Sequence, residues 1–192
     1  ITPESGTVRL DGKDITHWPE HRRATLIGRV FQNPFSGTAP HLTVAENLAL
    51  ATRRGRPRGL HPALNRRMKQ EFRDRLRALN LGIEDRLNTE IGTLSGGQRQ
   101  AITLLMATWL RPSLLLLDEH TAALDPRTAE QVIRLTDHII RQDNLTTLMV
   151  THSMPQAVNL GNRLLMLHRG KIVLDLAGDA KRRLRVETLH EK

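Results

Sequence analysis

The heptapeptide LSGGQRQ, residues 94–100, is the most informative segment of this chain. Ser95 and Gln98 fit the pattern S-x-x-Q, a capping box in which each side chain bonds a free backbone N–H at the start of a helix. Capping alone does not explain the two adjacent glycines, because glycine costs about 1 kcal/mol relative to alanine inside a helix. Exposed backbone N–H groups at the positive end of a helix dipole suit an anion. We therefore predict an anion-binding helix tip here, followed by a helix to about Leu110.

A second informative segment is LLLLDEH, residues 114–120. Its short apolar run predicts a strand buried on both faces. Asp118 and Glu119 stand where the run stops, at the carboxyl end of a strand, which is where ligands bind in open α/β sheets. Adjacent residues on an extended strand point to opposite sides. One carboxylate is therefore available to hold Mg²⁺, and the other to polarise a water for attack on a phosphoryl group.

Three further polar residues stand at the ends of predicted elements. Gln32 ends the predicted strand IGRVFQ, and His152 ends the predicted strand LTTLMVTH. Asp125 precedes Pro126, and an N-cap followed by proline at the first helical position explains it without any function. A lone histidine is also usually structural. These residues gain significance only from their position among the other motifs.

Composition and charge restrict the class of protein. Cysteine is absent from the 192 residues, which excludes disulfides and thiolate metal sites. No stretch reaches the roughly 18 consecutive apolar residues of a membrane span. The net charge is +9, but aromatic residues make up only 3%, which leaves few platforms for stacking bases. We interpret the arginine clusters at residues 53–77 and 181–185 as solvated surface with some attraction to anionic lipid headgroups, and we expect no nucleic-acid partner.

The order of the predicted elements indicates an α/β fold. A hairpin at residues 8–15 turns at Asp11-Gly12. Helical patterns follow at residues 44–51, 65–79 and 95–110, and from residue 114 strands alternate with helices. Such alternation implies a mostly parallel sheet with flanking helices.

The opening segment also contains a Gly-Lys pair, Gly12-Lys13. A phosphate-binding loop requires G-x-x-x-x-G-K-[ST]. Gly6 and Gly12 are one residue too far apart, and Asp14 stands where the hydroxyl belongs and would repel phosphate. We therefore predict that residues 1–192 contain no such loop.

Gln32, LSGGQ, LLLLDE, the Ala-Leu-Asp triplet and Thr151-His152 occur in the order and contexts of the ATP-binding subunit of ABC transporters, which the whole chain resembles. The resemblance implies a P-loop NTPase-like fold. Residues 1–32 and 112–192 would form parts of the RecA-like core, and residues 33–111 an inserted helical subdomain. The family's first strands and phosphate loop would lie before Ile1, so the resemblance implies an N-terminally truncated sequence; a degenerate subunit is the alternative.

The resemblance also implies roles for single residues. Glu119 is expected to be the catalytic base and Asp118 a Mg²⁺ ligand. Gln32 is expected to touch both Mg²⁺ and the attacking water. His120 departs from the family, which commonly has proline at this position, but it removes no catalytic atom.

The remaining expected contacts are to ATP. The resemblance implies that the signature residues Ser95, Gly96, Gly97 and Gln98 contact the γ-phosphate of ATP held by the opposite subunit. It places Asp125 at the dimer interface, and it implies that His152 contacts the γ-phosphate.

By the same resemblance, the cofactors are ATP and Mg²⁺, and the partners are a second ATPase subunit, integral membrane permease subunits and a separate substrate-binding protein. The chain would lie peripherally on the cytoplasmic face of the membrane and energise import of a small solute such as an amino acid. Two alternatives stay open: a soluble ABC ATPase of DNA repair or translation, and a non-catalytic subunit.

Overall fold

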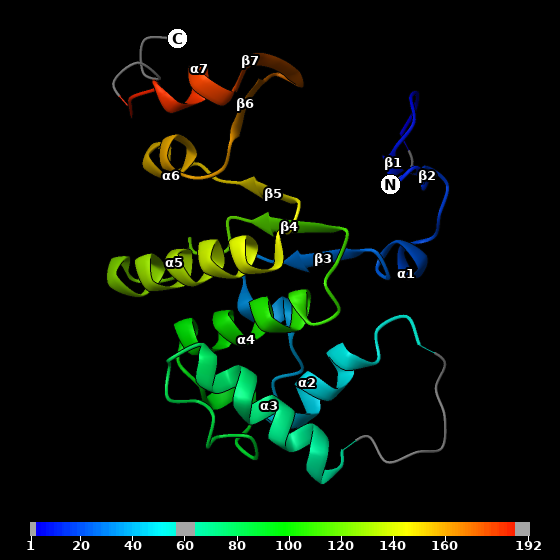
Figure 1. Cartoon of the computed structure of the whole chain (residues 1–192), viewed down its shortest axis with the longest axis vertical. Helices are drawn as coiled ribbons and strands as arrows, with labels where there is room; N and C mark the ends of the chain where they lie inside the picture. Colours follow the sequence, from blue (N-terminus) through cyan, green and yellow to red (C-terminus); the bar gives the residue numbers. More distant parts are fainter. Residues whose placement is uncertain (1–2, 57–63, 187–192) are drawn as a thin grey trace. The chain divides into compact units, whose positions relative to one another are not determined.

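The chain divides into two units, residues 1–149 and 150–192. A three-stranded sheet, ordered β3–β4–β5, lies in the first unit except for the last residue of β5. The computed structural model describes residues 3–56 and 64–186 (Figure 1). Strand β3 (Ile27–Val30) pairs in parallel with β4 (Leu114–Asp118), and β5 (Thr147–Val150) lies on the other side of β4. The predicted α/β fold with a parallel strand pair is confirmed.

Strand β4 is fully buried on only one of its faces. Leu115 and Leu117 are buried and pack with Val30 of β3 and Leu104 of α4, whereas Leu114 and Leu116 alternate with them as half-buried residues. The expectation of burial on both faces was therefore wrong. Alternation of this kind is typical of a strand with one well-covered face.

The predicted N-terminal hairpin is confirmed, with shorter strands than expected. Strands β1 (Arg9–Leu10) and β2 (Lys13–Asp14) are antiparallel. Asp11 and Gly12 have φ of 49° and 73°, as a two-residue turn with positive φ at both positions requires. The short helix α1 (Glu20–Arg23) leads from the hairpin to β3.

Helices of the segment between β3 and β4 pack around their own apolar core. Two short 3₁₀ turns, η1 (Pro34–Gly37) and η2 (Ile91–Thr93), accompany α2 (Val44–Thr52), α3 (Arg66–Ala78) and α4 (Gly96–Thr108). In Figure 1, α4 lies between the strands on one side and α2 and α3 on the other. The buried side chains of this core include Leu48, Phe72, Leu76, Ile83, Ile91, Ile102 and Trp109. All three predicted helices are confirmed.

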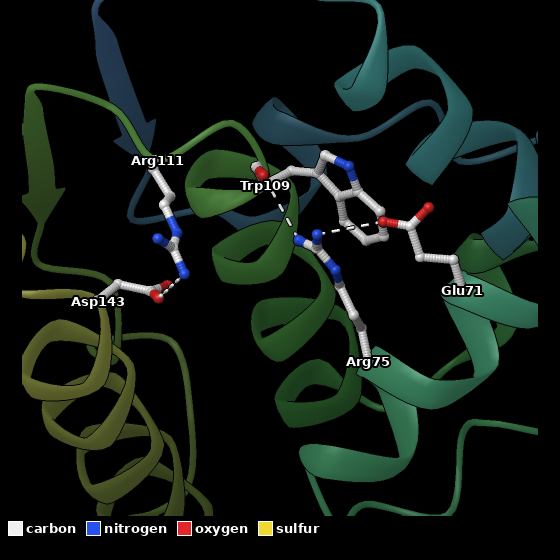
Figure 2. A network of polar contacts seen from close by, with 5 residues as sticks. All are labelled: Glu71, Arg75, Trp109, Arg111 and Asp143. Atoms are coloured by element: carbon white, nitrogen blue, oxygen red, sulfur yellow. Dashed lines mark hydrogen bonds and ion pairs between the residues drawn. The ribbon is translucent and has the colours of Figure 1, made fainter.

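The C-terminal end of α4 is fixed against α3 through Trp109 (Figure 2). The ring of Phe72 meets the indole edge-on at 5.2 Å between centroids. The guanidinium of Arg75 lies 3.9 Å from the indole centroid, donates to the Trp109 carbonyl at 3.4 Å and pairs with Glu71 at 3.2 Å. Trp109 is therefore held by apolar, cation–π and hydrogen-bond contacts together.

Helix α5 (Pro126–Asp143) follows the loop after β4. Asp125 caps its first turn, as predicted, and Asn144 ends it in the left-handed conformation at φ 50°. An ion pair of 3.2 Å joins Arg111, just before β4, to Asp143 in the last turn (Figure 2).

The second unit contains a helix, a hairpin and a short terminal helix: α6 (Met154–Asn159), β6 (Arg163–His168), β7 (Lys171–Ala177) and α7 (Gly178–Arg182). The predicted final strand pair is confirmed as antiparallel. The predicted basic C-terminal helix is short, and residues 187–192 lie outside the described part. Among the described residues, no helix has the length and apolar character needed to cross a membrane.

Candidate functional site

Polar side chains in and just after two neighbouring strands meet where β3 and β4 end. Gln32 Nε2 donates to Glu119 Oε2 at 3.4 Å. Asp118, the last residue of β4, accepts from Arg29 of β3 at 3.0 Å. Strand β3 ends at Val30, so Gln32 lies in the following loop rather than in the strand. The structure thus brings Gln32, Asp118 and Glu119 to one edge of the sheet.

The sequence suggested an extended backbone at Glu119, but the structure has a turn there. The φ of Glu119 is 44°, in the left-handed region, and its carbonyl accepts from Ala122 N–H at 2.9 Å. A left-handed conformation at a residue other than glycine costs on the order of 1–3 kcal/mol and is concentrated at functional sites. The two carboxylates therefore diverge because the chain turns at Glu119, not because a strand alternates.

Arg29 is a part of the site that the sequence did not predict. Its guanidinium also lies 4.4 Å from the centroid of the Phe31 ring, two residues along β3. The side chains of Arg29 and Asp118 are 51% and 46% exposed, so the pair contributes at most about 1 kcal/mol. The ion pair orients the Asp118 carboxylate toward β3.

His120 is buried directly behind the acid pair. Its Nε2 lies 3.1 Å from Thr136 Oγ1, and that hydroxyl donates to the Val132 carbonyl at 2.8 Å. Because the hydroxyl proton is used, the ring nitrogen Nε2 carries the proton and donates to Thr136. Burial lowers the pKa of His120 to about 4. His120, which departs from the family pattern, is therefore an uncharged side chain that joins the turn at Glu119 to α5 by a hydrogen bond.

The predicted capping box at the start of α4 is confirmed. Ser95 Oγ accepts from Gln98 N–H at 3.2 Å, and Gln98 Oε1 accepts from Ser95 N–H at 3.3 Å. Gln98 Nε2 also donates to the Leu81 carbonyl at 3.2 Å. Ser95 and Gly96 are exposed, whereas Gly97 is buried. The helix tip is thus open at its first two residues only.

Packing against α5 accounts for Gly97 in a way that the sequence did not indicate. A Cβ on Gly97 would lie 2.2 Å from Thr128 Cγ2 in the first turn of α5. The same turn is capped by Asp125, whose pKa is lowered by hydrogen bonds from the Thr128 side chain and backbone N–H. A groove of about 520 Å³ opens beside this contact and is lined by Ser95 and Gly97 among others. The structure therefore places the tip of α4 beside the start of α5.

His152 belongs to the second unit, where it is exposed and lies two residues after β5 ends. Its neighbours are held locally: Thr151 Oγ1 donates to Gln156 Oε1 at 2.9 Å and accepts from Ser153 N–H at 3.0 Å. The role expected of His152 stays a prediction.

The oxygen atoms at the strand edge are suited to Mg²⁺. Within residues 3–56 and 64–186, no group of three or more His, Cys, Asp or Glu side chains could enclose a metal ion. Mg²⁺ does not need such a cage, because it is usually held by one or two carboxylates together with substrate phosphates and water. The carboxylates of Asp118 and Glu119 and the amide oxygen of Gln32 fit that kind of site.

Comparison with known proteins identifies the family. The ABC transporter family model matches residues 1–122. The chain is 45% identical over 192 residues to a tyrosine transport ATP-binding protein of Clostridioides difficile (strain R20291), covering all of this chain and 76% of the relative. It is 35% identical over 174 residues to the thiamine import ATP-binding protein ThiQ of Escherichia coli (strain K12), covering 90% and 69%. The chain therefore belongs to the ABC transporter family of ATP-binding proteins.

Solved structures agree with this fold. A nucleotide-free ATP-binding cassette from an ABC transporter has a TM-score of 0.74 at 20% identity, covering all of this chain and 76% of the other. A dimeric ATP-binding cassette in a post-hydrolysis state, bound to ADP and Pi, has a TM-score of 0.72 at 28% identity, covering 92% and 75%. ATP binding and hydrolysis are the activity of this domain in its family, so the predicted family and enzyme class are confirmed.

Gly97→Ala tests the contact between α4 and α5. The added methyl group would overlap Thr128 Cγ2, so we expect unfolding free energy to fall by about 1–3 kcal/mol. Thr128→Ser removes Cγ2 and should restore most of the loss in the double variant, measured by urea denaturation. Gly96→Ala is the matched control, because its Cβ would lie 3.1 Å from a flexible leucine end and should cost less. Equal losses in the single and double variants would contradict the contact.

The buried imidazole of His120 predicts a pH dependence of stability. Its pKa is about 4 in the folded chain and 6.5 when exposed, so the unfolded chain binds the proton more tightly between these values. The stability due to the neutral ring is complete above pH 6.5 and is lost as pH falls toward 4. Between about pH 7.5 and about pH 5 the wild type should lose about 2 kcal/mol more than His120→Asn in urea denaturation.

The exposed His138 of α5 provides the control for this experiment. His138→Asn should keep the wild-type pH dependence. If His120→Asn lost as much stability as the wild type over the same pH interval, the claim that the buried His120 imidazole is neutral in the folded chain would be refuted.

Proposed function

We propose that this chain is the ATP-hydrolysing portion of an importer of a small solute and that it works as a pair of identical subunits. The observation that carries the proposal is the meeting of Gln32 and Glu119 beside Asp118 at one edge of the sheet. A carboxylate beside an amide is an arrangement that orients a water for attack on phosphorus. The import function is supported by relatives described as a thiamine import and a tyrosine transport ATP-binding protein.

Glu119 is the proposed general base. Its left-handed backbone turns the side chain toward Gln32, which donates to Oε2 and restricts the position of the carboxylate. Asp118, together with phosphate oxygens, would hold Mg²⁺, which neutralises phosphate charge when bound. Arg29 orients the Asp118 carboxylate from the neighbouring strand.

The tip of α4 is the proposed contact to the ATP of the other subunit. Ser95 Oγ and the backbone N–H group of Gly96 are the exposed donors at the positive end of the helix dipole, whereas Gly97 is buried against α5. Gln98 supports these donors, because its side chain is engaged by the cap and by the Leu81 carbonyl.

A composite site needs a second copy of the chain. Asp125, exposed at the start of α5 beside the tip, is proposed to lie at the interface between the copies. His152 is proposed to contact the γ-phosphate. The dimeric cassette bound to ADP and Pi supports a paired arrangement.

The partners on the membrane side are proposed from the same family membership. Residues 33–111 would form the helical subdomain that docks onto permease subunits at the cytoplasmic face of the membrane, with a separate binding protein delivering the solute. The core shared by α2, α3 and α4 supports treating this segment as one body. Its surface exposes Phe35 and Leu50, at 45% and 57%, which are available for apolar contact with a partner.

Glu119→Gln in the full-length protein tests the proposed function. The amide keeps the shape but accepts no proton, so turnover of ATP should fall at least about 100-fold. Binding of ATP should change less than about threefold, because the base acts in the transition state. Phosphate release and nucleotide binding by calorimetry measure the two quantities. Glu130→Gln, on the exposed face of α5, is the control and should have normal turnover.

Two results would contradict the proposal. Normal hydrolysis by Glu119→Gln would remove this residue from the role of base. A full-length wild-type protein that binds ATP without any turnover would instead favour a non-catalytic subunit.

A further inference from the structure

Two consecutive side chains of α4 contact the loop that carries Gln32, one on each side of it. We define residues 31–35 as the glutamine loop. Gln100 Nε2 donates to the Phe31 carbonyl at 3.3 Å, immediately before Gln32. The guanidinium of Arg99 lies 3.7 Å from the centroid of the Phe35 ring, three residues after it. The helix that begins at the phosphate-binding tip therefore also holds the backbone on either side of Gln32.

Arg99 connects the glutamine loop to the residues that precede the tip. It is buried, and its guanidinium donates to three backbone carbonyls: Ile91 at 3.2 Å, Gly92 at 2.9 Å and Leu94 at 2.9 Å. These carbonyls belong to the segment that immediately precedes Ser95 in the chain. The Arg99 side chain thus hydrogen-bonds to residues 91–94, which precede the tip, and also stacks on Phe35.

Gln100 lowers the stability of the fold through its buried amide oxygen, and the bond donated by its NH₂ group is the reason for an amide at this position. It has no exposed surface, and its Oε1 has no hydrogen-bond partner among the described residues. A buried acceptor without a partner lowers stability, whereas an apolar side chain of the same shape would not. The amide orientation is fixed, because a carbonyl oxygen at Phe31 accepts a bond only from the NH₂ end. The residue therefore retains its amide for the bond to Phe31.

We propose that Gln100 is a positioning residue for ATP hydrolysis. It fixes the Phe31 carbonyl and, through it, the backbone from which Gln32 reaches Glu119. It acts from the same helix whose tip would contact the phosphate of the other subunit. This inference rests on the proposed roles of Gln32 and Glu119, and it adds a residue that touches neither nucleotide nor carboxylate.

Gln100→Met in the full-length protein tests the inference. Methionine fills similar space and lacks the donor, so kcat for ATP should fall about five- to tenfold, the effect of one lost hydrogen bond. KM for ATP should stay within about twofold, because Gln100 has no exposed surface with which to meet a nucleotide. The melting temperature should be unchanged or higher, because the buried Oε1 is removed at the same time. Gln100→Leu serves as a second variant with the same expectations.

The effect should also depend on Gln32. In a Gln32→Ala background, adding Gln100→Met should lower kcat no further, because the two residues act through one contact. Thr108→Val is a buried change on α4, and the Thr108 hydroxyl donates to the Leu104 and Leu105 carbonyls of the same helix, so kcat should stay unchanged.

Three outcomes would overturn the inference. Gln100→Met with normal kcat, while Gln32→Ala lowers it, would remove Gln100 from positioning and leave the proposed function intact. A fall in kcat that is additive with Gln32→Ala, or that accompanies a loss of several degrees in melting temperature, would assign Gln100 a purely structural role. Normal kcat in Gln32→Ala would refute the proposed role of Gln32, and the inference with it.

Discussion

The close approach of neighbouring segments to α4 is the constraint on which the site depends. At three contacts a glycine leaves no room for a side chain: Gly28 of β3, Gly37 of η1 and Gly97 at the tip itself. A Cβ at these positions would lie 2.5, 2.7 and 2.2 Å from the nearest atom of the opposing segment. The strand, the loop after it and the start of α5 are therefore all brought against one helix. Because interiors are packed at crystal-like density, such contacts do not deform gradually.

This packing explains why residues far apart in the sequence serve one proposed site. Gln32 follows β3 and Glu119 follows β4, and the two strands are parallel neighbours. Helix α4 carries the tip at one end and holds the glutamine loop through Arg99 and Gln100. The tip and the glutamine loop are therefore held by neighbouring side chains of one helix, Arg99 and Gln100, both of which are buried.

Local chemistry made much of the fold predictable from sequence. The capping box at Ser95, the Asp-Gly turn and the Asp125 cap depend on residues within a few positions of each other, so their patterns are visible in the sequence. What could not be predicted depends on tertiary contacts. The pair of Arg29 and Asp118 joins residues 89 positions apart and requires the register of β3 against β4. The link from His120 to Thr136 likewise depends on how α5 returns beside β4.

The order of motifs in the sequence identified candidate site residues, whose roles stay predictions, but it did not predict their geometry. Motif order singled out the acid pair, the glutamine and the tip, and the structure brings Gln32 to Glu119. The left-handed turn at Glu119 follows no sequence rule, because the bond from Ala122 N–H stabilises a conformation that glutamate rarely adopts. The burial of Gly97 also has a packing cause, since Thr128 occupies the space where its side chain would be.

In the proposed dimer, each catalytic site combines Glu119 of one copy with Ser95 of the other. The most direct measurement is ATP turnover by a purified heterodimer in which one full-length subunit carries Glu119→Gln and the other Ser95→Arg, with a different tag on each. Each homodimer should be inactive. One of the two composite sites in the heterodimer is intact, so its turnover should recover to roughly half that of the wild type. A heterodimer as inactive as both parents would contradict a site shared between two copies.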